Sequence, residues 1–142
     1  MGLKQIDHGT EAYQQMVQLR HQILRAPLGL QFTPEELMAE KEEILIAAFD
    51  DDDIMGCCML SPVNDTTVRL RQMAVLDQVQ GTGIGASIMT FAENIARDKG
   101  FAKMMMHARA TAVGFYEKFG YKVIGAEFSE VQLPHFMMEK LL

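Results

Sequence analysis

The sequence has few cysteines, few prolines and no long apolar segment. Its 142 residues include four prolines and two adjacent cysteines, Cys57 and Cys58. Neighbouring residues on a strand point to opposite faces, so we expect these thiols to be unpaired and buried in a reduced, cytoplasmic protein. No metal site is expected, because no second cysteine or histidine cluster completes a ligand set. No segment reaches the roughly 20 apolar residues of a membrane span, and no export signal is recognisable.

Basic residues are also in the minority. The chain carries 13 lysines and arginines against 19 aspartates and glutamates, which gives a formal charge of -6. This balance works against a polyanionic partner such as nucleic acid, but it leaves room for a small anion held by backbone amides. There is no internal repeat and no proline-rich or serine-rich linker. We therefore expect a single domain over residues 1–142.

Hydrophobic periodicity predicts the secondary structure of the first half of the chain. A helix is expected over Tyr13–Leu24, and a second begins at Thr33 with a capping box and ends near Lys41. The aspartates 50–53 are interpreted as a solvated turn between antiparallel strands at 44–49 and 54–60. A calcium loop is the alternative, although its later ligands are missing.

In the second half of the chain, the sequence pattern predicts an alternation of strands and helices. Strands are expected over 68–76, 102–108, 121–124 and 135–141. Helices are expected over 84–99 and 111–119. The order predicts a mixed sheet with helices on both faces, in which the strand-helix-strand unit 68–108 is parallel.

Three alternating glycines join a predicted strand to the longest predicted helix, in the segment Gln80-Gly81-Thr82-Gly83-Ile84-Gly85. Glycine allows close backbone approach, and the free N–H groups of a helix N-terminus favour an anion such as pyrophosphate. A P-loop would need a lysine where Ala86-Ser87 stands. A dinucleotide fold would need an acidic residue near Met106 and more strand-helix-strand units. A tight turn without a ligand stays open.

Two motifs together resemble the GCN5-related N-acetyltransferase (GNAT) family. Gln80, Gly83 and Gly85 match its coenzyme A signature, and the segment 112–125 (AVGFYEKFGYKVIG) resembles a second family motif. The tail 127–140 further resembles a subgroup of small bacterial acetyltransferases similar to YjcF and ElaA. The resemblance implies an α/β (α+β) fold: a mixed, mostly antiparallel sheet of about seven strands, with helices on both faces and a splayed parallel pair at the cofactor cleft.

The resemblance also implies an acetyl-CoA-dependent transfer of an acetyl group to a primary amine of a small molecule or protein, by direct attack on the thioester. The main chain of Met73 and Val75 would hold the pantetheine arm, and residues 80–85 the pyrophosphate. The expected cofactor-binding residues are Met73, Ala74, Val75, Gln80, Gly81, Thr82, Gly83, Ile84, Gly85, Ala86, Ala112, Phe115 and Lys118.

Tyr116 is the expected general acid, since a phenol with pKa near ~10 can protonate a departing thiolate. The alternative is a tyrosine that only packs in the core. The main-chain N–H of Val75 would polarise the carbonyl. Glu127 and His135 are candidates for the base or for acceptor contacts, with Glu130 and His107 as further candidates.

The acceptor is the least determined part of the expectation. Arg109 stands where many family members have asparagine, and it could bind an acidic group of the acceptor, a cofactor phosphate or neither. The acidic surface slightly favours a cationic amine. A non-catalytic acyl-CoA-binding module and, more remotely, a nicotinamide oxidoreductase are the competing hypotheses. A homodimer is possible, and neither nucleic acid nor membrane is an expected partner.

Overall fold

The computed structural model describes residues 2–142, in which seven strands form one mixed sheet. The strands are β1 (Gly2–Ile6), β2 (Ile44–Asp50), β3 (Asp53–Pro62), β4 (Thr67–Val75), β5 (Lys103–Arg109), β6 (Lys122–Glu130) and β7 (Leu133–Leu141). Their order across the sheet is β1-β2-β3-β4-β5-β7-β6. Only β4 and β5 run parallel, and every other neighbouring pair is antiparallel. The predicted mixed sheet is confirmed, whereas the single domain over 1–142 stays a prediction.

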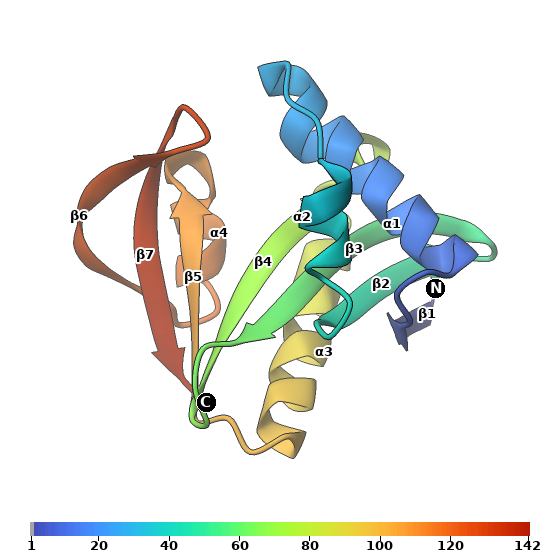
Figure 1. Cartoon of the computed structure of the whole chain (residues 1–142). Helices are drawn as coiled ribbons and strands as arrows, with labels where there is room; N and C mark the ends of the chain where they lie inside the picture. Colours follow the sequence, from blue (N-terminus) through green and yellow to red (C-terminus); the bar gives the residue numbers. More distant parts are fainter. Residues whose placement is uncertain (1) are drawn as a thin grey trace.

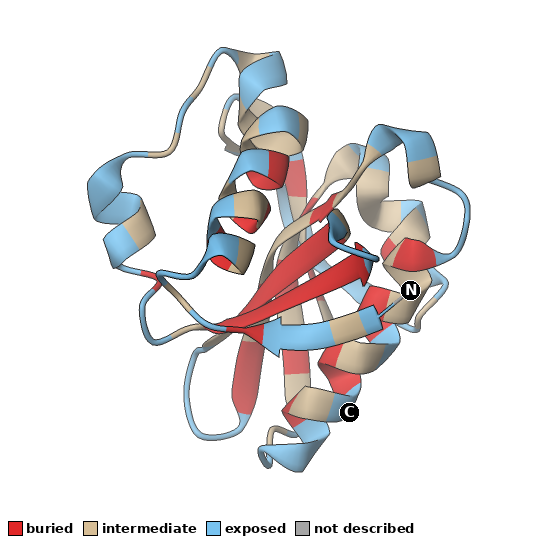
Figure 2. Ribbon diagram, turned by 90° about the vertical axis from the view of Figure 1, so that its right-hand side faces the viewer, coloured by how far each residue is buried: buried red, intermediate tan, exposed pale blue. Residues whose placement is uncertain are grey.

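Helices cover both faces of this sheet, as predicted (Figure 1). They are α1 (Glu11–Arg20), α2 (Pro34–Met38), α3 (Ile84–Asp98) and α4 (Val113–Glu117). A π-helical turn, His21–Arg25, extends α1, and three 3-10 turns lie at Ala26–Leu28, Asp77–Val79 and Ala110–Ala112. Figure 2 shows the buried central strands between the two helical layers. Among residues 2–142, no helix is long and apolar enough to cross a membrane.

The helix starts follow from side-chain capping. Thr10 accepts a hydrogen bond from the N–H of Tyr13 at the start of α1. The predicted capping box at Thr33 is confirmed, with reciprocal bonds to Glu36. Pro34 follows at the first helical position, where its missing N–H costs nothing. The helix ends at Met38, three residues before the predicted Lys41.

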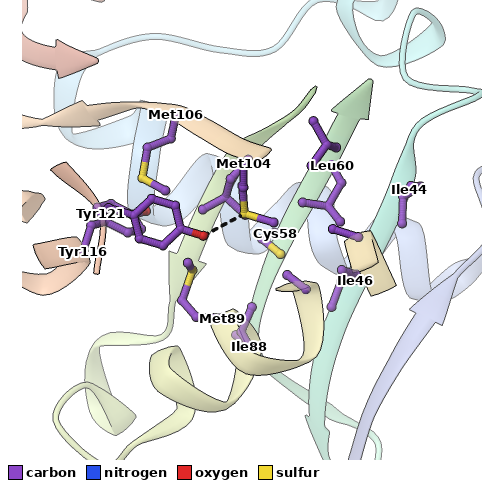
Figure 3. Close-up of a cluster of buried hydrophobic side chains, with 14 of the residues drawn as sticks. Ile44, Ile46, Cys58, Leu60, Ile88, Met89, Met104, Met106, Tyr116 and Tyr121 are labelled. Atoms are coloured by element: carbon purple, nitrogen blue, oxygen red, sulfur yellow. Dashed lines mark hydrogen bonds between the residues drawn. The ribbon is translucent and has the colours of Figure 1, made fainter. Parts of the chain in front are cut away.

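Two hydrophobic clusters lie on opposite faces of the sheet, one under α3 and α4 and one under α1. The adjacent thiols divide between them: Cys58 belongs to the first and Cys57 to the second. Both are free and fully buried, as predicted, and burial raises the pKa of the Cys57 thiol to about 12. Figure 3 shows Cys58 beside Met104 in the first cluster, where the hydroxyl of Tyr121 donates to the Met104 sulfur at 3.1 Å.

A buried ion pair holds α1 against the segment that follows α2. The guanidinium of Arg20 donates to both oxygens of Glu40, at 2.7 and 2.6 Å, and the hydroxyl of Tyr13 donates to the same carboxylate at 2.7 Å. Arg20 is fully buried and Glu40 is 4% exposed. Because a buried charge is tolerated only with such partners, this triad fixes the position of the layer that continues into His21–Arg25.

The sequence predicts strands at 121–124 and 135–141 with a loop at 127–134 between them, and this loop is wrong. The strand β6 continues through Glu130, and β7 already begins at Leu133, so these residues form a hairpin. The register shifts between Ile124 and Phe128, with Gly125 at a φ of 80°, which breaks the alternation that identifies a strand. The turn residues Val131 and Gln132 both have positive φ, although neither is a residue type that favours it.

Candidate active site

The parallel strands β4 and β5 separate and open a cleft. They pair only from Thr67–Leu70 to Lys103–Met106, although both strands continue beyond that stretch. Figure 1 shows the two strands diverging. A cleft of about 360 Å³ lies there. Its walls come from four parts of the chain, namely β4, β5, the Ala112–Tyr116 turn and helix, and the β6-β7 hairpin, with Leu24 and Arg25 at one side.

A bulge in β4 reverses its two faces at the cleft. The register with β3 shifts between Cys57 and Met59, and Gln72 has a φ of 55°, which is strained for a residue with a Cβ. Leu70 therefore packs under α3, whereas Ala74, an even number of residues later, packs under α1. Met73 and Val75 now face the α3 cluster. The extra residue thus separates a polar stretch of β4 from an apolar one.

The same bulge leaves a main-chain donor of β4 directed toward β5. The N–H of Leu76 donates to the carbonyl of Met55 at 2.9 Å, and Ala74 pairs with Cys57. Because N–H groups alternate sides along an antiparallel strand, the N–H of Val75 is directed away from β3 and toward β5. The pairing with β5 has ended there, so this N–H is available to a ligand.

The glycine-rich turn forms the N-terminus of α3. Gly81 has a φ of 81° and Gly83, the N-cap, a φ of 92°, and both have open space where a Cβ would stand. The first helical bond that closes on the cap runs from Ser87 N to Gly83 O, at 3.0 Å. The N–H groups of Ile84, Gly85 and Ala86 precede it and have no intrahelical acceptor. The turn therefore presents unshielded donors at the positive end of a 15-residue helix.

The polar side chains of this turn are used to hold the turn itself. Gln80 donates to the carbonyl of Val75 and to the carboxylate of Asp77, both at 3.1 Å. The hydroxyl of Thr82 donates to the carbonyl of Val79. Gln80 and Thr82 thus tie the turn to the end of β4, and an anion here would be bound by the main chain.

Gly85 and Ile84 contribute to packing at the start of α3. A Cβ at Gly85 would lie 3.1 and 3.2 Å from two carbons of the Phe115 ring, so a larger residue would force this ring to shift by a few tenths of an ångström. Ile84 is 8% exposed and belongs to the core. Only the main chain of these two residues is therefore available for the predicted cofactor contacts.

Tyr116 lies at the apolar wall of the cleft together with Ala112. It packs edge-to-face against Phe115, and burial raises the pKa of its phenol, which keeps the hydroxyl protonated. Within residues 2–142 this hydroxyl makes no hydrogen bond, in contrast to that of Tyr121, which donates to Glu93 at 2.8 Å. Tyr116 therefore has a proton to donate in the cleft. Lys118, at the end of α4, is exposed and does not line the cleft.

The opposite wall of the cleft carries a cluster of ionisable groups. Nδ1 of His107 lies 3.0 Å from both Arg69 Nη2 and Glu130 Oε1. Nδ1 of His135 donates to the carbonyl of Leu133, and its Nε2 lies 3.7 Å from Glu130 Oε2. Glu130 thus stands between two imidazoles and one guanidinium. Burial by itself would raise the pKa of Glu130, but the hydrogen bond with His107 and the nearby positive charges lower it.

The structure brings together some of the predicted base candidates and not others. His135, 3% exposed, lines the cleft together with His107 and Glu130. Glu127 is exposed on β6 and does not line the cleft, since it lies in the stretch where β6 loses register with β7. Among residues 2–142, no three histidine, cysteine, aspartate or glutamate side chains are placed to hold a metal ion.

Three arginines of the cleft were not among the predicted site residues, namely Arg25, Arg69 and Arg71. For two of them, the sequence contains a pattern that indicates their position. Arg69 and Arg71 alternate in VRLRQM, where an amphipathic strand presents both to one face. Arg25 had none, because it reaches the cleft only through the π-helical turn after α1.

Comparisons with known proteins agree with this architecture. Residues 10–142 match the family model described as Acetyltransferase (GNAT) domain. YjcF of Bacillus subtilis, an uncharacterised N-acetyltransferase, is 32% identical over 107 residues, which cover 75% of this chain and 74% of YjcF. The chain spans about half the length, between 43% and 50%, of three other curated relatives that it matches.

Solved structures share the fold at low sequence identity. Escherichia coli ElaA superposes with a TM-score of 0.85 at 14% identity, over 99% of both chains. An aminoglycoside 6'-N-acetyltransferase complexed with coenzyme A gives a TM-score of 0.81 at 18% identity, over 99% of this chain and 97% of that one. Likenesses at such identity establish the fold alone. Together with the family match over residues 10–142, they show that the chain belongs to the GNAT acetyltransferase family.

Proposed function

We propose that the protein is an N-acetyltransferase that uses acetyl-CoA to acetylate a primary amine of a small molecule or peptide. The observation that carries the proposal is the separation of β4 and β5, which leaves the N–H of Val75 directed away from β3 beyond the end of the β4-β5 pairing and opens a cleft that the protonated Tyr116 lines. Family membership supports acetyl transfer as the class of reaction, and a neighbour with the same fold was solved with coenzyme A.

The residues present fit coenzyme A. Its diphosphate needs several donors that no side chain covers, and the turn at Gly81 and Gly83 has open space and free N–H groups. Its pantetheine arm carries amide groups, and the exposed edge of β4 at Met73 and Val75 offers main-chain partners of the same kind. Bound there, the cofactor supplies an acetyl group activated as a thioester.

Around that thioester, different residues of the chain have different roles. The N–H of Val75 is directed to where it can donate to a carbonyl oxygen that gains negative charge. Tyr116 holds a proton at Oη that a thiolate can accept. Both groups are positioned before any ligand arrives, because the bulge fixes one and the packing against Phe115 fixes the other.

For the proton that the amine loses, the structure favours the cluster of His107, Glu130 and His135. Glu130 carries the negative charge of this cluster and is hydrogen-bonded to His107. An amine in the cleft could therefore pass its proton to Glu130 directly or through water. Glu127 lies outside the cleft lining, which makes it the weaker candidate.

The position of the thiols supports direct transfer to the amine. Cys57 and Cys58 are fully buried in the two cores, and neither lines the cleft. A covalent acetyl-cysteine step would need an accessible thiolate, which burial disfavours by raising both thiol pKa values.

The proposal is tested by measuring thiol release from acetyl-CoA against a panel of amines, amino acids, amino sugars and peptides. We expect amine-dependent thiol release together with a higher melting temperature in the presence of coenzyme A. Stabilisation by coenzyme A without turnover of any amine would instead favour an acyl-CoA-binding module. No stabilisation and no turnover would exclude both.

A further inference from the structure

The cleft is far more positive than the protein that contains it. The chain has a formal charge of -6, yet the cleft is lined by four arginines, Arg25, Arg69, Arg71 and Arg109, and by one carboxylate, Glu130. Such a concentration of guanidinium groups in an acidic protein is costly unless a negative ligand compensates it. The charges of the cleft therefore contain information about the acceptor.

Two of the four arginines already have carboxylate partners. Arg25 pairs with Glu36 at 3.2 Å. Arg69 lies 3.9 Å from Glu130 and contacts His107 at 3.0 Å. Among residues 2–142, Arg71 and Arg109 have no carboxylate within ion-pair distance. They are the two cleft cations that remain for a ligand.

Arg109 is held in the cleft by the main chain. Its Nη2 donates to the carbonyl of Leu24 at 2.9 Å, which fixes the guanidinium while leaving its charge uncompensated. Burial, and then the charge of Arg25, lower the pKa of Arg109. A carboxylate bound beside it would remove this penalty, and the planar fork of arginine suits bidentate binding of a carboxylate.

Arg71 faces the cleft from the opposite strand. It belongs to β4 directly before the bulge, whereas Arg109 ends β5, so the two arginines come from the two strands that have separated, and both line the cleft. Neither lies at the glycine-rich turn, and no residue of that turn lines the cleft. The phosphates of a cofactor on the turn are therefore not the natural partners of these arginines.

The size of the cleft limits what the anion can belong to. At about 360 Å³ it is near the lower end of the range of roughly 300 to 1,000 Å³ found for small-molecule sites. An amino acid, or the end of a peptide, fits such a space better than a large polycation. The cationic amine that the overall charge favoured would be repelled by the arginines.

We propose that the acceptor is a small amine that also carries a carboxylate, bound through that carboxylate by Arg71 and Arg109. This inference rests on the proposed acetyl transfer and specifies its substrate class. The unpaired guanidinium groups act as specificity determinants, since they orient the amine toward the Tyr116 wall of the cleft.

The test compares matched pairs of acceptors that differ only in the carboxylate. Each proteinogenic amino acid is assayed for thiol release beside its amide, and phosphoethanolamine beside ethanolamine. We expect the preferred amino acid to exceed its amide in kcat/KM by about 10- to 100-fold, as a lost hydrogen bond to a charged group predicts. A preference for phosphoethanolamine over every amino acid would overturn the assignment of a carboxylate.

Variants assign the preference to particular residues. Arg71→Gln and Arg109→Gln should each reduce the ratio between acid and amide about tenfold. Arg97→Gln, a change of an exposed arginine on α3, is the matched control and should leave the ratio intact. A ratio near one in the wild-type protein, or a ratio unchanged in both cleft variants, would contradict the proposal.

A binding measurement separates this inference from the proposed function. With coenzyme A present, the preferred amino acid should raise the melting temperature more than its amide does, and Arg109→Gln should abolish the difference. Acetylation of neutral or cationic amines as efficient as that of carboxylated ones would sink the inference and leave acetyl transfer standing. Absence of both turnover and cofactor binding would sink acetyl transfer itself.

Discussion

Tyr116 and Tyr121 are two neighbouring phenols of one cluster whose hydroxyl groups have different surroundings. Both are buried within the core beneath α3 and α4. The hydroxyl of Tyr121 donates a hydrogen bond to Glu93 and contacts the sulfur of Met104, whereas Tyr116 lines the cleft. The partner of the hydroxyl, more than the depth of burial, separates a structural tyrosine from a candidate acid.

Tyr116→Phe should therefore reduce kcat by about 100-fold or more, because it removes the proton donor and leaves the packing ring. The affinity for coenzyme A, measured by calorimetry, should stay within about twofold, which is less than one neutral hydrogen bond contributes. Tyr121→Phe is the matched control: it should lower the melting temperature, since it removes one of the hydrogen bonds to the buried Glu93, to which Lys140 still donates, and spare kcat. Equal kcat values for Tyr116→Phe and wild type would remove Tyr116 from the mechanism.

The lowered pKa of Glu130 leads to a prediction about how the stability of the protein depends on pH. Although burial opposes it, the hydrogen bond with His107 and the charges of His107, Arg69 and His135 lower the pKa of this carboxyl. A lowered folded-state pKa means that the carboxylate contributes stability above its unfolded value of about 4.3. That contribution is lost as the pH falls through the folded-state pKa.

Carboxyl carbon NMR can measure this pKa directly. The titration midpoint of Glu130 should lie below about 4.3, and Arg69→Met should raise it because a neighbouring positive charge is gone. Arg97→Gln, distant from the cluster, should leave the midpoint where it is. A midpoint at or above the ordinary glutamate value would show that burial outweighs the neighbouring charges.

At the level of elements, the glycine-rich turn and the bulge of β4 create the site together. Gln80 connects them, since it donates to the carbonyl of Val75 at the end of the bulged strand. The unshielded N–H donors at the start of α3 and the free N–H of β4 are thus fixed relative to one another. A long substrate that needs both ends held at once suits such an arrangement.

Gly83 and Gly100 provide a controlled test of the turn, because they lie at opposite ends of α3. Their φ angles are 92° and 90°, and each has open space at the Cβ position. Alanine at either position should destabilise the protein by a similar amount, about 1 to 2 kcal/mol, from backbone strain alone. Only Gly83→Ala should also weaken coenzyme A binding, by about tenfold, because it shifts donors to a charged group. Equal cofactor affinities for the two variants would exclude the turn as the binding site.

Elements with strong periodicity or side-chain caps could be predicted, and elements made by irregular backbone could not. The capping box at Thr33 and the division of Cys57 and Cys58 between two faces follow from local rules and are confirmed. The bulge at Gln72 leaves no mark in the sequence, since its strain is compensated only by packing on both faces. The turn at Val131 and Gln132 is a similar case, because neither residue type indicates a turn with positive φ.

The side chains of the cleft show the same limit. The glycines and Tyr116 belong to local motifs, whereas the contact of Glu130 with His107 joins residues 23 positions apart and depends on the order of β5, β7 and β6. Arg25 depends on the π-helical turn that continues α1. Residue type alone indicates neither contact, so the charge of the cleft emerges only in the folded chain.

On the scale of the whole molecule, the apolar clusters and the polar groups of the cleft occupy different parts of the sheet. Tyr116 belongs to the apolar cluster under α3 and α4, whereas the arginines and the Glu130 cluster line the cleft and belong to neither apolar cluster. The Arg20–Glu40 ion pair holds α1 against the segment that follows α2. The cleft joins the two faces where β4 and β5 part, so a cofactor and an acceptor can meet there from opposite sides.

The central claim is that coenzyme A lies with its diphosphate on the turn before α3 and its pantetheine arm along β4. The most direct measurement is an amide NMR titration of the isotope-labelled protein with coenzyme A. The account predicts saturable shifts that are largest at Val75, Gly81, Gly83 and Gly85, and small at Gly29 and Gly100, which have similar backbone angles elsewhere. Saturable shifts centred on another surface, or no saturable shifts at all, would contradict it.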